Sequence, residues 1–289
     1  MTLAELIADS ALRLSQAGVQ FGQGTLDATD EAAWLVLWQL GLALDTPFDE
    51  STAPLSADDI QAAQALVSRR IETRQPAAYL TGEAWLQGVP FFVDARSIIP
   101  RSLIAEVLAE GYLDEWLPPT PPRIMDLCTG NGSLAVLAAL AWPEASVDGL
   151  DLSEQALEVA QRNVTRHGLD GRIRLLASDG FARASGRYDM ILCNPPYVNA
   201  QSMATLPPEF RAEPALALAG GKDGMDFVRR CLREATQWLT PEGVLVLEIG
   251  HEIAYFEAAF PELEGLWLET SAGHEQVVLL TAQALLTLS

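Results

Sequence analysis

Residues 124–133 read Ile124-Met125-Asp126-Leu127-Cys128-Thr129-Gly130-Asn131-Gly132-Ser133, an apolar run that leads directly into a glycine-rich turn. Gly130, Gly132 and Ala135 follow the spacing G-x-G-x-x-G/A, and residues 133–142 have the composition of a helix. Glycines at a strand-to-helix turn let backbone N–H groups approach a ligand closely, and the helix N-terminus favours negative charge. The stretch predicts a cofactor site in an α/β fold, although this spacing equally suits a nicotinamide dinucleotide.

The alternation of strand and helix continues beyond this turn. Strands are predicted at residues 124–128, 146–150, 172–176, 188–193 and 244–249, and helices at 133–142, 153–167 and 227–239. Such alternation predicts a mainly parallel, doubly wound sheet. Residues 266–270 and 276–281 read as two strands joined by a short loop, so an antiparallel pair should close the sheet. The predicted fold class is α/β, a Rossmann-like domain with antiparallel C-terminal strands.

The chain before residue 123 has a different pattern. Apolar residues at helical spacing predict helices at residues 3–14, 30–44 and 56–73, and Trp34 and Trp38 fall on one apolar stripe of the second. Residues 84–93 then read as a β-hairpin, and four prolines between Pro118 and Pro122 mark a stiff boundary. We therefore expect a helical domain at 1–82, a hairpin and linker at 83–122, and the α/β domain at 123–289.

Composition narrows the classes of function. The chain carries 39 Asp and Glu against 18 Lys and Arg, a net charge of −21. A surface this acidic repels phosphate backbones and attracts basic proteins, so duplex DNA is an unfavourable partner. No apolar run reaches the ~18 residues of a membrane span, and the N-terminus lacks the features of a signal peptide, so we expect a cytoplasmic protein. The wide spacing of Cys128, Cys193 and Cys231 predicts packing residues rather than a disulfide or metal site.

Three acids follow the predicted strands. Asp151 ends the second strand about 20 residues after the glycine turn, where a carboxylate can accept both ribose hydroxyl protons. Asp126 lies within the first strand, where it could brace the turn or reach a ligand. Asp179 follows the third strand and could accept a hydrogen bond from an adenine amine. These acids are compatible with either a nicotinamide cofactor or S-adenosylmethionine.

The loop Asn194-Pro195-Pro196-Tyr197 stands at the carboxyl end of the fourth predicted strand, where open α/β sheets place their active sites. An amide or aromatic amine is a poor nucleophile because its lone pair is delocalised. Acceptors on its N–H bonds, here the Asn194 side-chain carbonyl and the Pro195 backbone carbonyl, can hold such a nitrogen. Tyr197 offers a flat face for stacking. The loop therefore predicts methylation of a planar nitrogen, and a dehydrogenase has no use for it.

Adenine, cytosine and glutamine all present such a nitrogen. A DNA-modifying enzyme needs a basic, target-reading surface, and the predicted helical domain is small and not notably basic. The sequence therefore favours a protein glutamine. A second glycine-rich segment, Gly220 to Gly224, follows no predicted strand, which argues against a phosphate cradle. A lid or substrate-lining loop is one interpretation of it, and a plain connector is the alternative.

The chain resembles the bacterial protein-(glutamine) methyltransferases, which modify release factors or a large-subunit ribosomal protein. The resemblance covers roughly residues 25 to 282 and rests on residues 78–82 (Ala-Tyr-Leu-Thr-Gly), 98–101 (Ile-Ile-Pro-Arg), 126–132, 194–197 and 219–224. In three details the chain resembles the branch that modifies large-subunit ribosomal protein three more than the branch that modifies release factors. They are Ser102 directly after Pro100-Arg101, Cys128 in place of the first glycine of the turn, and Ala84-Trp85-Leu86 in the hairpin.

The resemblance implies a class I methyltransferase domain with S-adenosylmethionine as methyl donor. It implies that the turn and Asp151 bind this donor, with Asp126 and Asp179 as further candidates, and that Asn194 to Tyr197 bind the glutamine amide; the turn residues are Cys128, Thr129, Gly130, Asn131 and Gly132. No metal is expected. The expected partner is a basic ribosomal protein, recognised through the helical domain. Release factors are the alternative substrate, and a non-catalytic ribosome-assembly factor is a further alternative.

Overall fold

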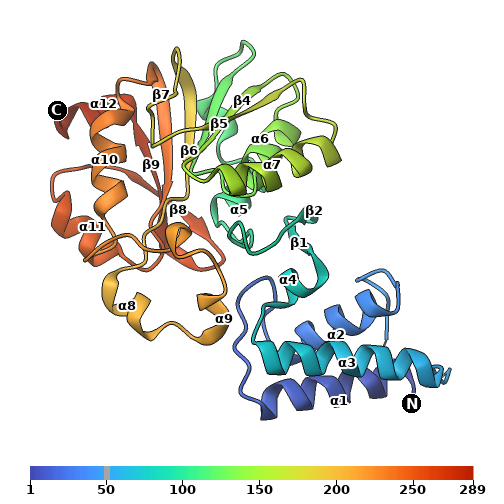
Figure 1. Ribbon diagram of the computed structural model, residues 1–289. Helices are drawn as coiled ribbons and strands as arrows, with labels where there is room; N and C mark the ends of the chain where they lie inside the picture. Colours follow the sequence, from blue (N-terminus) through green and yellow to red (C-terminus); the bar gives the residue numbers. More distant parts are fainter. Residues whose placement is uncertain (49–52, 289) are drawn as a thin grey trace.

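The computed structural model describes residues 1–48 and 53–288, which form a small helical part and a larger α/β part (Figure 1). The helical part contains α1 (Leu3–Gln16), α2 (Ala28–Gln39), α3 (Ala57–Thr73) and the short α4 (Ala77–Thr81). Capping explains where three of them begin. Thr2 and Glu5 form a capping box on α1, Asp27 accepts from two backbone N–H groups of α2, and Ser56 caps α3.

Helix α2 departs from the prediction in two ways. It ends at Gln39, because Leu40 caps it and Gly41 follows at φ +66°, the left-handed conformation that commonly ends a helix. It also packs against both α1 and α3, so its buried face is wide. Trp34 lies in the helical core with 7 % of its surface exposed, whereas Trp38 falls on the remaining solvent strip and is 39 % exposed. The predicted common stripe was therefore wrong for Trp38.

The hairpin follows as β1 (Glu83–Leu86) and β2 (Val89–Phe92), with Gln87 and Gly88 at positive φ in its two-residue turn. The buried side chain of Asn163 attaches the hairpin to the α/β part. Its Oδ1 accepts from the Phe92 N–H at 2.7 Å, and its Nδ2 donates to the carbonyls of Phe92 at 3.0 Å and Asn131 at 2.9 Å. One amide therefore joins the hairpin to the glycine-rich turn. The linker continues through α5 (Ile104–Ala109) and the 3-10 turn η1 (Asp114–Trp116).

The described part of the chain forms a seven-stranded sheet in the order β5-β4-β3-β6-β7-β9-β8. The strands are β3 (Arg123–Leu127), β4 (Ser146–Asp151), β5 (Ile173–Ala177), β6 (Tyr188–Cys193), β7 (Leu239–Glu248), β8 (Leu266–Thr270) and β9 (Gly273–Thr281). The first five pair in parallel, and β9 pairs antiparallel with both β7 and β8. The predicted parallel sheet with an antiparallel C-terminal pair is confirmed.

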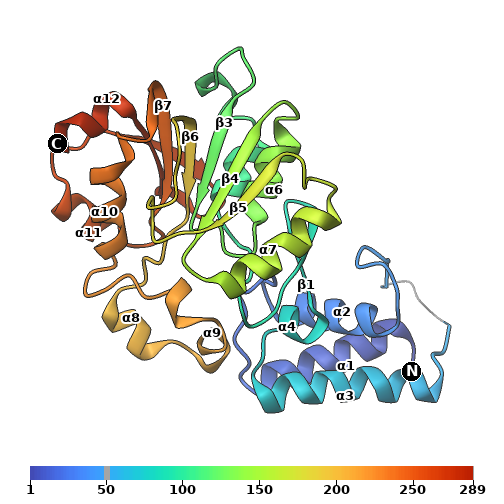
Figure 2. The ribbon, with the colours of Figure 1, turned by 45° about the horizontal axis from the view of Figure 1, so that its top comes forward.

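Helices cover both faces of this sheet, as Figures 1 and 2 show. The hydrophobic core on one face includes α5, α6 and α7, and the core on the other includes α10, α11 and α12. The helices are α6 (Ser133–Ala141), α7 (Glu154–Arg166), α8 (Ala200–Thr205), α9 (Pro208–Arg211), α10 (Asp226–Ala235), α11 (Ile253–Ala259) and α12 (Ala282–Leu285), with 3-10 turns η2 (Ala215–Ala217) and η3 (Leu286–Leu288). Helix α10 is shorter than predicted, because β7 already begins at Leu239.

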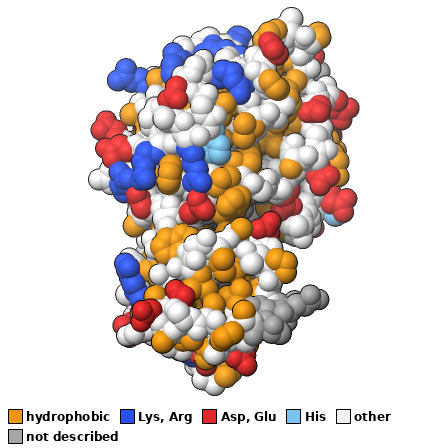
Figure 3. Space-filling view, turned by 90° about the vertical axis from the view of Figure 1, so that its right-hand side faces the viewer, with side chains coloured by type: hydrophobic (Ala, Val, Ile, Leu, Met, Phe, Trp, Pro, Cys, Tyr) orange, Lys and Arg blue, Asp and Glu red, His pale blue; other side chains and the backbone are white. Residues whose placement is uncertain are grey.

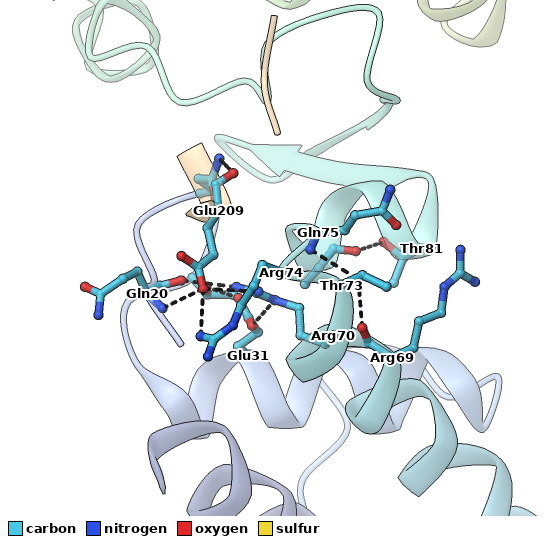
Figure 4. Close-up of polar contacts among 12 residues, drawn as sticks. Gln20, Glu31, Arg69, Arg70, Thr73, Arg74, Gln75, Thr81 and Glu209 are labelled. Carbon is cyan, nitrogen blue, oxygen red and sulfur yellow. Dashed lines mark hydrogen bonds and ion pairs between the residues drawn. The ribbon is translucent and has the colours of Figure 1, made fainter. Parts of the chain in front are cut away.

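The short helix α9 contacts the helical part through Glu209, whose side chain lies beside Gln20, Arg70 and Arg74 (Figure 4). Its Glu209 carboxylate is fully buried and accepts from Arg74 Nη1 at 3.1 Å and from the Gln20 N–H at 3.3 Å. Arg70, also buried, lies 3.8 Å from Glu209 and donates to Glu31 at 2.8 Å. We call these four charged residues, Glu31, Arg70, Arg74 and Glu209, the interdomain charge cluster. It fixes the helical part against the segment that follows the Asn194 loop.

Candidate active site

A cavity lies at the carboxyl ends of β3, β4 and β6, where the strand order changes direction. It is lined from one side by the glycine-rich turn and Asp151, and from another by the loop 194–197. The linker residues 96–102 and the segment 214–218 complete its wall. The structure thus brings the two predicted motifs, 62 residues apart between Gly132 and Asn194, to one site.

The turn after β3 has the left-handed backbone that its glycines predict. Gly130 has φ +55° and Gly132 φ +80°. A Cβ on Gly132 would lie 3.0 Å from the Cβ of Ala160 on α7, so a side chain there meets packed atoms. Cys128 occupies the same conformation at φ +66° although it is not glycine. The backbone of the turn therefore keeps the glycine-like bend, and the Cys128 residue lines the cavity.

Asp126 braces this turn from inside the sheet. One carboxylate oxygen, Oδ2, accepts from Thr129 Oγ1 and from the Ala135 N–H at 2.9 Å. The other, Oδ1, is buried and has no hydrogen-bond partner among the described residues. Burial raises the pKa of this carboxyl to about 7. A buried acceptor without a partner is costly, and this one belongs to a residue of the cavity wall.

Asp151 lies at the end of β4, across the turn from Asp126. Its Oδ2 accepts from the Gly130 N–H at 2.8 Å, and its Oδ1 from the Ser153 N–H at 2.8 Å. Burial raises the pKa of Asp151, while these backbone donors lower it. Each oxygen keeps a lone pair for a further donor, so the carboxylate is oriented and still able to accept from hydroxyl groups.

These residues fit S-adenosylmethionine. The ligand carries an ammonium group, which suits the unpartnered Asp126 Oδ1, and a ribose diol, which suits Asp151. Asn131 Nδ2 is a second buried polar atom of the cavity wall without a partner in the described chain, and it suits a carboxylate. The left-handed turn leaves room for close backbone approach. The donor and acceptor groups of the wall therefore match those of the methyl donor.

Asp179 lies at the rim of the cavity, where its side chain is 64 % exposed. Its carboxylate pairs with Arg230 Nη1, and its backbone carbonyl accepts from Arg230 Nη2 at 2.8 Å. The predicted contact with an adenine amine would therefore use an acid that is already paired. Phe227 on α10 also lines the cavity and offers a flat apolar face. Sequence reasoning did not select it, because a phenylalanine in a helix reads as core.

The loop after β6 faces the same cavity from the other side. Pro195 is buried, Asn194 and Tyr197 are partly buried, and all four loop residues contribute to the wall. The Asn194 side chain makes no hydrogen bond within the described chain, so its carbonyl oxygen is available to a substrate. The Tyr197 hydroxyl donates to Glu248 at 3.1 Å. Burial raises the pKa of Tyr197, so the phenol stays protonated.

The cavity wall near the Asn194 loop is supported by an ion pair, Arg101 with the buried Glu213, that the sequence did not reveal. Arg101 donates to both oxygens of the fully buried Glu213 carboxylate, at 2.6 and 2.8 Å. Glu213 also accepts from the Ile99 N–H at 3.0 Å. The Arg101 guanidinium lies 5.8 Å from the ring centre of Phe210. The segment Ile98–Arg101, one of the stretches that carry the family resemblance, thus forms part of the cavity wall together with Tyr197.

The remaining candidates have structural surroundings. Cys193 and Cys231 are buried, and burial raises the pKa of Cys193 well above its ordinary value, so its thiol is neutral. Within residues 1–48 and 53–288, no cluster of three or more His, Cys, Asp and Glu side chains is arranged to hold a metal ion. The segment Gly220–Gly224 does not line the cavity; it packs behind Tyr197 instead. The interpretation of this segment as a lining loop was wrong, because its glycines provide close backbone contact with Tyr197 instead.

Comparison with known proteins agrees with this geometry. Residues 109–278, more than half the chain, match the family model of the methyltransferase small domain. The chain is 52 % identical to the ribosomal protein uL3 glutamine methyltransferase of Bordetella pertussis, over 99 % of this chain and 97 % of that protein. It is 50 % identical to the protein of the same name from Burkholderia pseudomallei, over 98 % and 95 %. The relative of that name from Neisseria meningitidis serogroup B is 45 % identical, over 99 % and 94 %.

A solved structure supports the fold alone. The hMettl16 catalytic domain, determined with a MAT2A 3′UTR hairpin, superposes with a TM-score of 0.51 at 14 % identity, covering 80 % of this chain and 83 % of that one. In the described residues, no helix combines the length and apolar character needed to cross a membrane. The sequence relatives carry the assignment: this chain belongs to the family of ribosomal protein uL3 glutamine methyltransferases.

Proposed function

We propose that this enzyme transfers a methyl group from S-adenosylmethionine to the side-chain amide nitrogen of a glutamine in ribosomal protein uL3. The observation that carries the proposal is the shared cavity: the Asn194 loop and the turn with Asp126 and Asp151 face each other across it. Relatives that match nearly the full length of this chain are named ribosomal protein uL3 glutamine methyltransferases, which supports the choice of substrate.

The loop residues would hold the amide rather than activate it by proton removal. The Asn194 side-chain carbonyl and the Pro195 backbone carbonyl accept its two N–H bonds, and Tyr197 stacks on its plane. S-adenosylmethionine, when bound, supplies an electrophilic methyl group on a sulfonium. As the nitrogen–methyl bond forms and the sulfur–methyl bond breaks, S-adenosylhomocysteine leaves, and the nitrogen then loses one N–H proton to water. Because the sulfonium is a good leaving group, positioning and exclusion of water supply most of the rate, and well-oriented reactants gain ~7–11 kcal/mol.

We propose cofactor roles for all the predicted residues of the other wall. Asp126 and Asn131 would bind the amino and carboxylate ends of the methyl donor. Asp151 would bind the ribose, and backbone groups of Cys128, Thr129, Gly130 and Gly132 would enclose the ligand. Asp179 at the rim would contact the adenine. None of these residues needs to change its protonation state during transfer.

The helical part is proposed to recognise the protein substrate. Figure 3 shows it as a smaller lobe with hydrophobic side chains on its surface. Among the described residues of this part, the exposed large apolar side chains are Met1, Leu12, Leu26, Trp38 and Leu42. The net charge of −21 attracts a basic ribosomal protein at long range, and we place the reaction in the cytoplasm, with neither duplex DNA nor membrane as partner.

An acceptor assay tests the choice of substrate. Purified enzyme is incubated with methyl-labelled S-adenosylmethionine and, in separate reactions, with uL3 and a peptide chain release factor. We expect label on uL3, and label confined to the release factor would identify the other branch of glutamine methyltransferases. Incorporation into neither protein would favour the non-catalytic alternative. A uL3 variant with alanine at the modified glutamine is the matched control for the site of transfer.

A further inference from the structure

Tyr197 is held at its hydroxyl by a carboxylate that does not reach the cavity. Glu248, the last residue of β7, is 3 % exposed and is absent from the cavity wall. Its Oε1 accepts from the Tyr197 hydroxyl at 3.1 Å. Its Oε2 accepts from Ser102 Oγ at 2.6 Å and from the Leu103 N–H at 2.9 Å. One buried carboxylate therefore ties the loop that follows β6 to the linker that precedes α5.

Three glycines enclose the same tyrosine. A Cβ on Gly250, two residues after Glu248, would lie 2.4 Å from Tyr197 Cε2 and 2.9 Å from its Cζ. A Cβ on Gly220 would lie 2.7 Å from the Tyr197 Cα, and one on Gly224 would overlap its carbonyl oxygen. We call Glu248, Gly220, Gly224 and Gly250 the tyrosine socket. Any side chain at the three glycine positions would displace the ring or the backbone of Tyr197.

The chemistry of the socket excludes a proton-accepting role for Tyr197. Its hydroxyl donates to a carboxylate, and Glu248 keeps two other donors on its second oxygen. Burial raises the pKa of Glu248, while the donors from Ser102, Tyr197 and Leu103 lower it. The one O–H proton of Tyr197 is thus committed to Glu248, while the residue lines the cavity. The contact between Tyr197 and Glu248 therefore sets the position of the Tyr197 ring.

We propose that Glu248 is a positioning residue for methyl transfer, which fixes the Tyr197 ring against the glutamine amide through the tyrosine hydroxyl. The inference rests on the proposed function for the identity of the amide. A planar amide must present one nitrogen at a fixed angle, and displacements near 1 Å cost about 100-fold in rate. The alternative is that Glu248 only anchors the linker through Ser102 and Leu103, with the tyrosine contact incidental.

A double-mutant cycle on kcat separates these two roles. The variants are Tyr197→Phe, Glu248→Leu and the double variant, with Glu248→Gln as the conservative replacement. Tyr197→Phe and Glu248→Leu should each lower kcat about tenfold, with the Kd for S-adenosylmethionine changed less than about twofold. In the Tyr197→Phe background, Glu248→Leu should then cost at most about twofold more. Glu248→Gln should retain at least about a third of wild-type kcat, because its amide can still pair with the phenol oxygen.

If Glu248→Leu lowered kcat equally in the wild-type and Tyr197→Phe backgrounds, the proposal would be overturned. Glu248 would then serve only to anchor the linker. Tyr188→Phe is the matched control. This buried tyrosine also donates to a carboxylate, Asp148 at 2.7 Å, but neither residue lines the cavity. Tyr188→Phe should lower Tm without changing kcat. That result would exclude the mere loss of a buried tyrosine contact as the cause of the lower kcat in Tyr197→Phe.

The cycle is measured on whichever acceptor takes label, uL3 or the release factor. Label only on the release factor would therefore overturn the proposed substrate while the cycle still decides the role of Glu248. Label on neither protein would overturn both. A third variant, Gly250→Ala, tests the socket from another side, and it should lower kcat without weakening S-adenosylmethionine binding. An unchanged kcat in folded Gly250→Ala would also count against a ring fixed by the socket.

Discussion

The Glu209 carboxylate of α9 accepts a hydrogen bond from Arg74 at the C-terminus of α3, and these two residues join the α/β part to the helical part at 3.1 Å. Arg74 adopts φ +56°, a conformation that is unfavourable for a side chain other than glycine, and it also donates to the carbonyls of Ala17 and Gly18. Buried ion pairs gain little over apolar packing but lose much when one partner is removed. The contact therefore fixes orientation more than it adds stability.

Removing the Glu209 charge should destabilise the protein strongly. Glu209→Gln leaves the guanidinium groups of Arg70 and Arg74 with Glu31 as the one remaining carboxylate of the cluster, so a buried positive charge is no longer balanced. We therefore expect the free energy of unfolding to fall by about 3 kcal/mol. Urea denaturation measures it. Glu158→Gln is the control, because Glu158 also makes a short pair, with Arg96 at 2.6 Å, but is 66 % exposed. It should cost less than about 1 kcal/mol. Equal losses in the two variants would show that burial of the interdomain charge cluster is unimportant.

Binding of S-adenosylmethionine should depend on pH through Asp126. Its pKa near 7 in the free protein means that it is protonated below pH 7, and the ionised form that pairs with an ammonium group is lost as pH falls. We expect binding to be about tenfold weaker at pH 6 than at pH 8 by calorimetry. Asp126→Asn should bind more weakly and flatten this dependence.

Asp151 faces the same cavity and also has a raised pKa, so Asp151→Asn is measured beside it. That variant should keep the change between pH 6 and 8. A pH dependence that survives in Asp126→Asn but vanishes in Asp151→Asn would reassign the titrating group.

The glycine-rich turn should tolerate no side chain at Gly132. A Cβ at this position would lie 3.0 Å from Ala160, and φ is +80°. Gly132→Ala should therefore shift α6 and the turn and weaken S-adenosylmethionine binding at least about tenfold. Gly168→Ala is the matched control. Gly168 has φ +67°, but a Cβ added there would have no described atom within 4 Å beyond its chain neighbours. It should lose about 1 kcal/mol of stability and keep its affinity, whereas equal binding losses in both would refute a local role for Gly132.

Much of the fold followed from local sequence pattern. The alternation of apolar runs and helical segments predicted the strand types and the antiparallel C-terminal pair, because each strand is a short buried run with turn residues at its ends. Asp126, Asp151 and Asn194 could be selected because each stands within or directly after a predicted strand. Parallel strands bring their carboxyl ends to one edge, and the cavity lies there.

The parts that escaped prediction depend on contacts between distant residues. Glu248 and Glu213 read as ordinary acids, yet their partners Ser102 and Arg101 lie 146 and 112 residues away. The short helices α8 and α9 have no apolar period to detect. Gly220 and Gly224 gave a signal, but their purpose, close backbone approach to Tyr197, is visible only in three dimensions.

In the proposed function, the Asn194 loop holds a glutamine amide of uL3 for methylation. The most direct measurement is peptide mass spectrometry of uL3 after incubation with S-adenosylmethionine and either wild-type enzyme or Asn194→Ala, beside calorimetric binding of the cofactor. The exposed variant Gln201→Ala is the control. We expect one methyl group on a glutamine side chain with wild type and Gln201→Ala. With Asn194→Ala the rate should fall at least about 100-fold, while cofactor affinity stays within about threefold. Methylation of uL3 at an undiminished rate by Asn194→Ala, or a methyl group on a residue other than glutamine, would contradict the account.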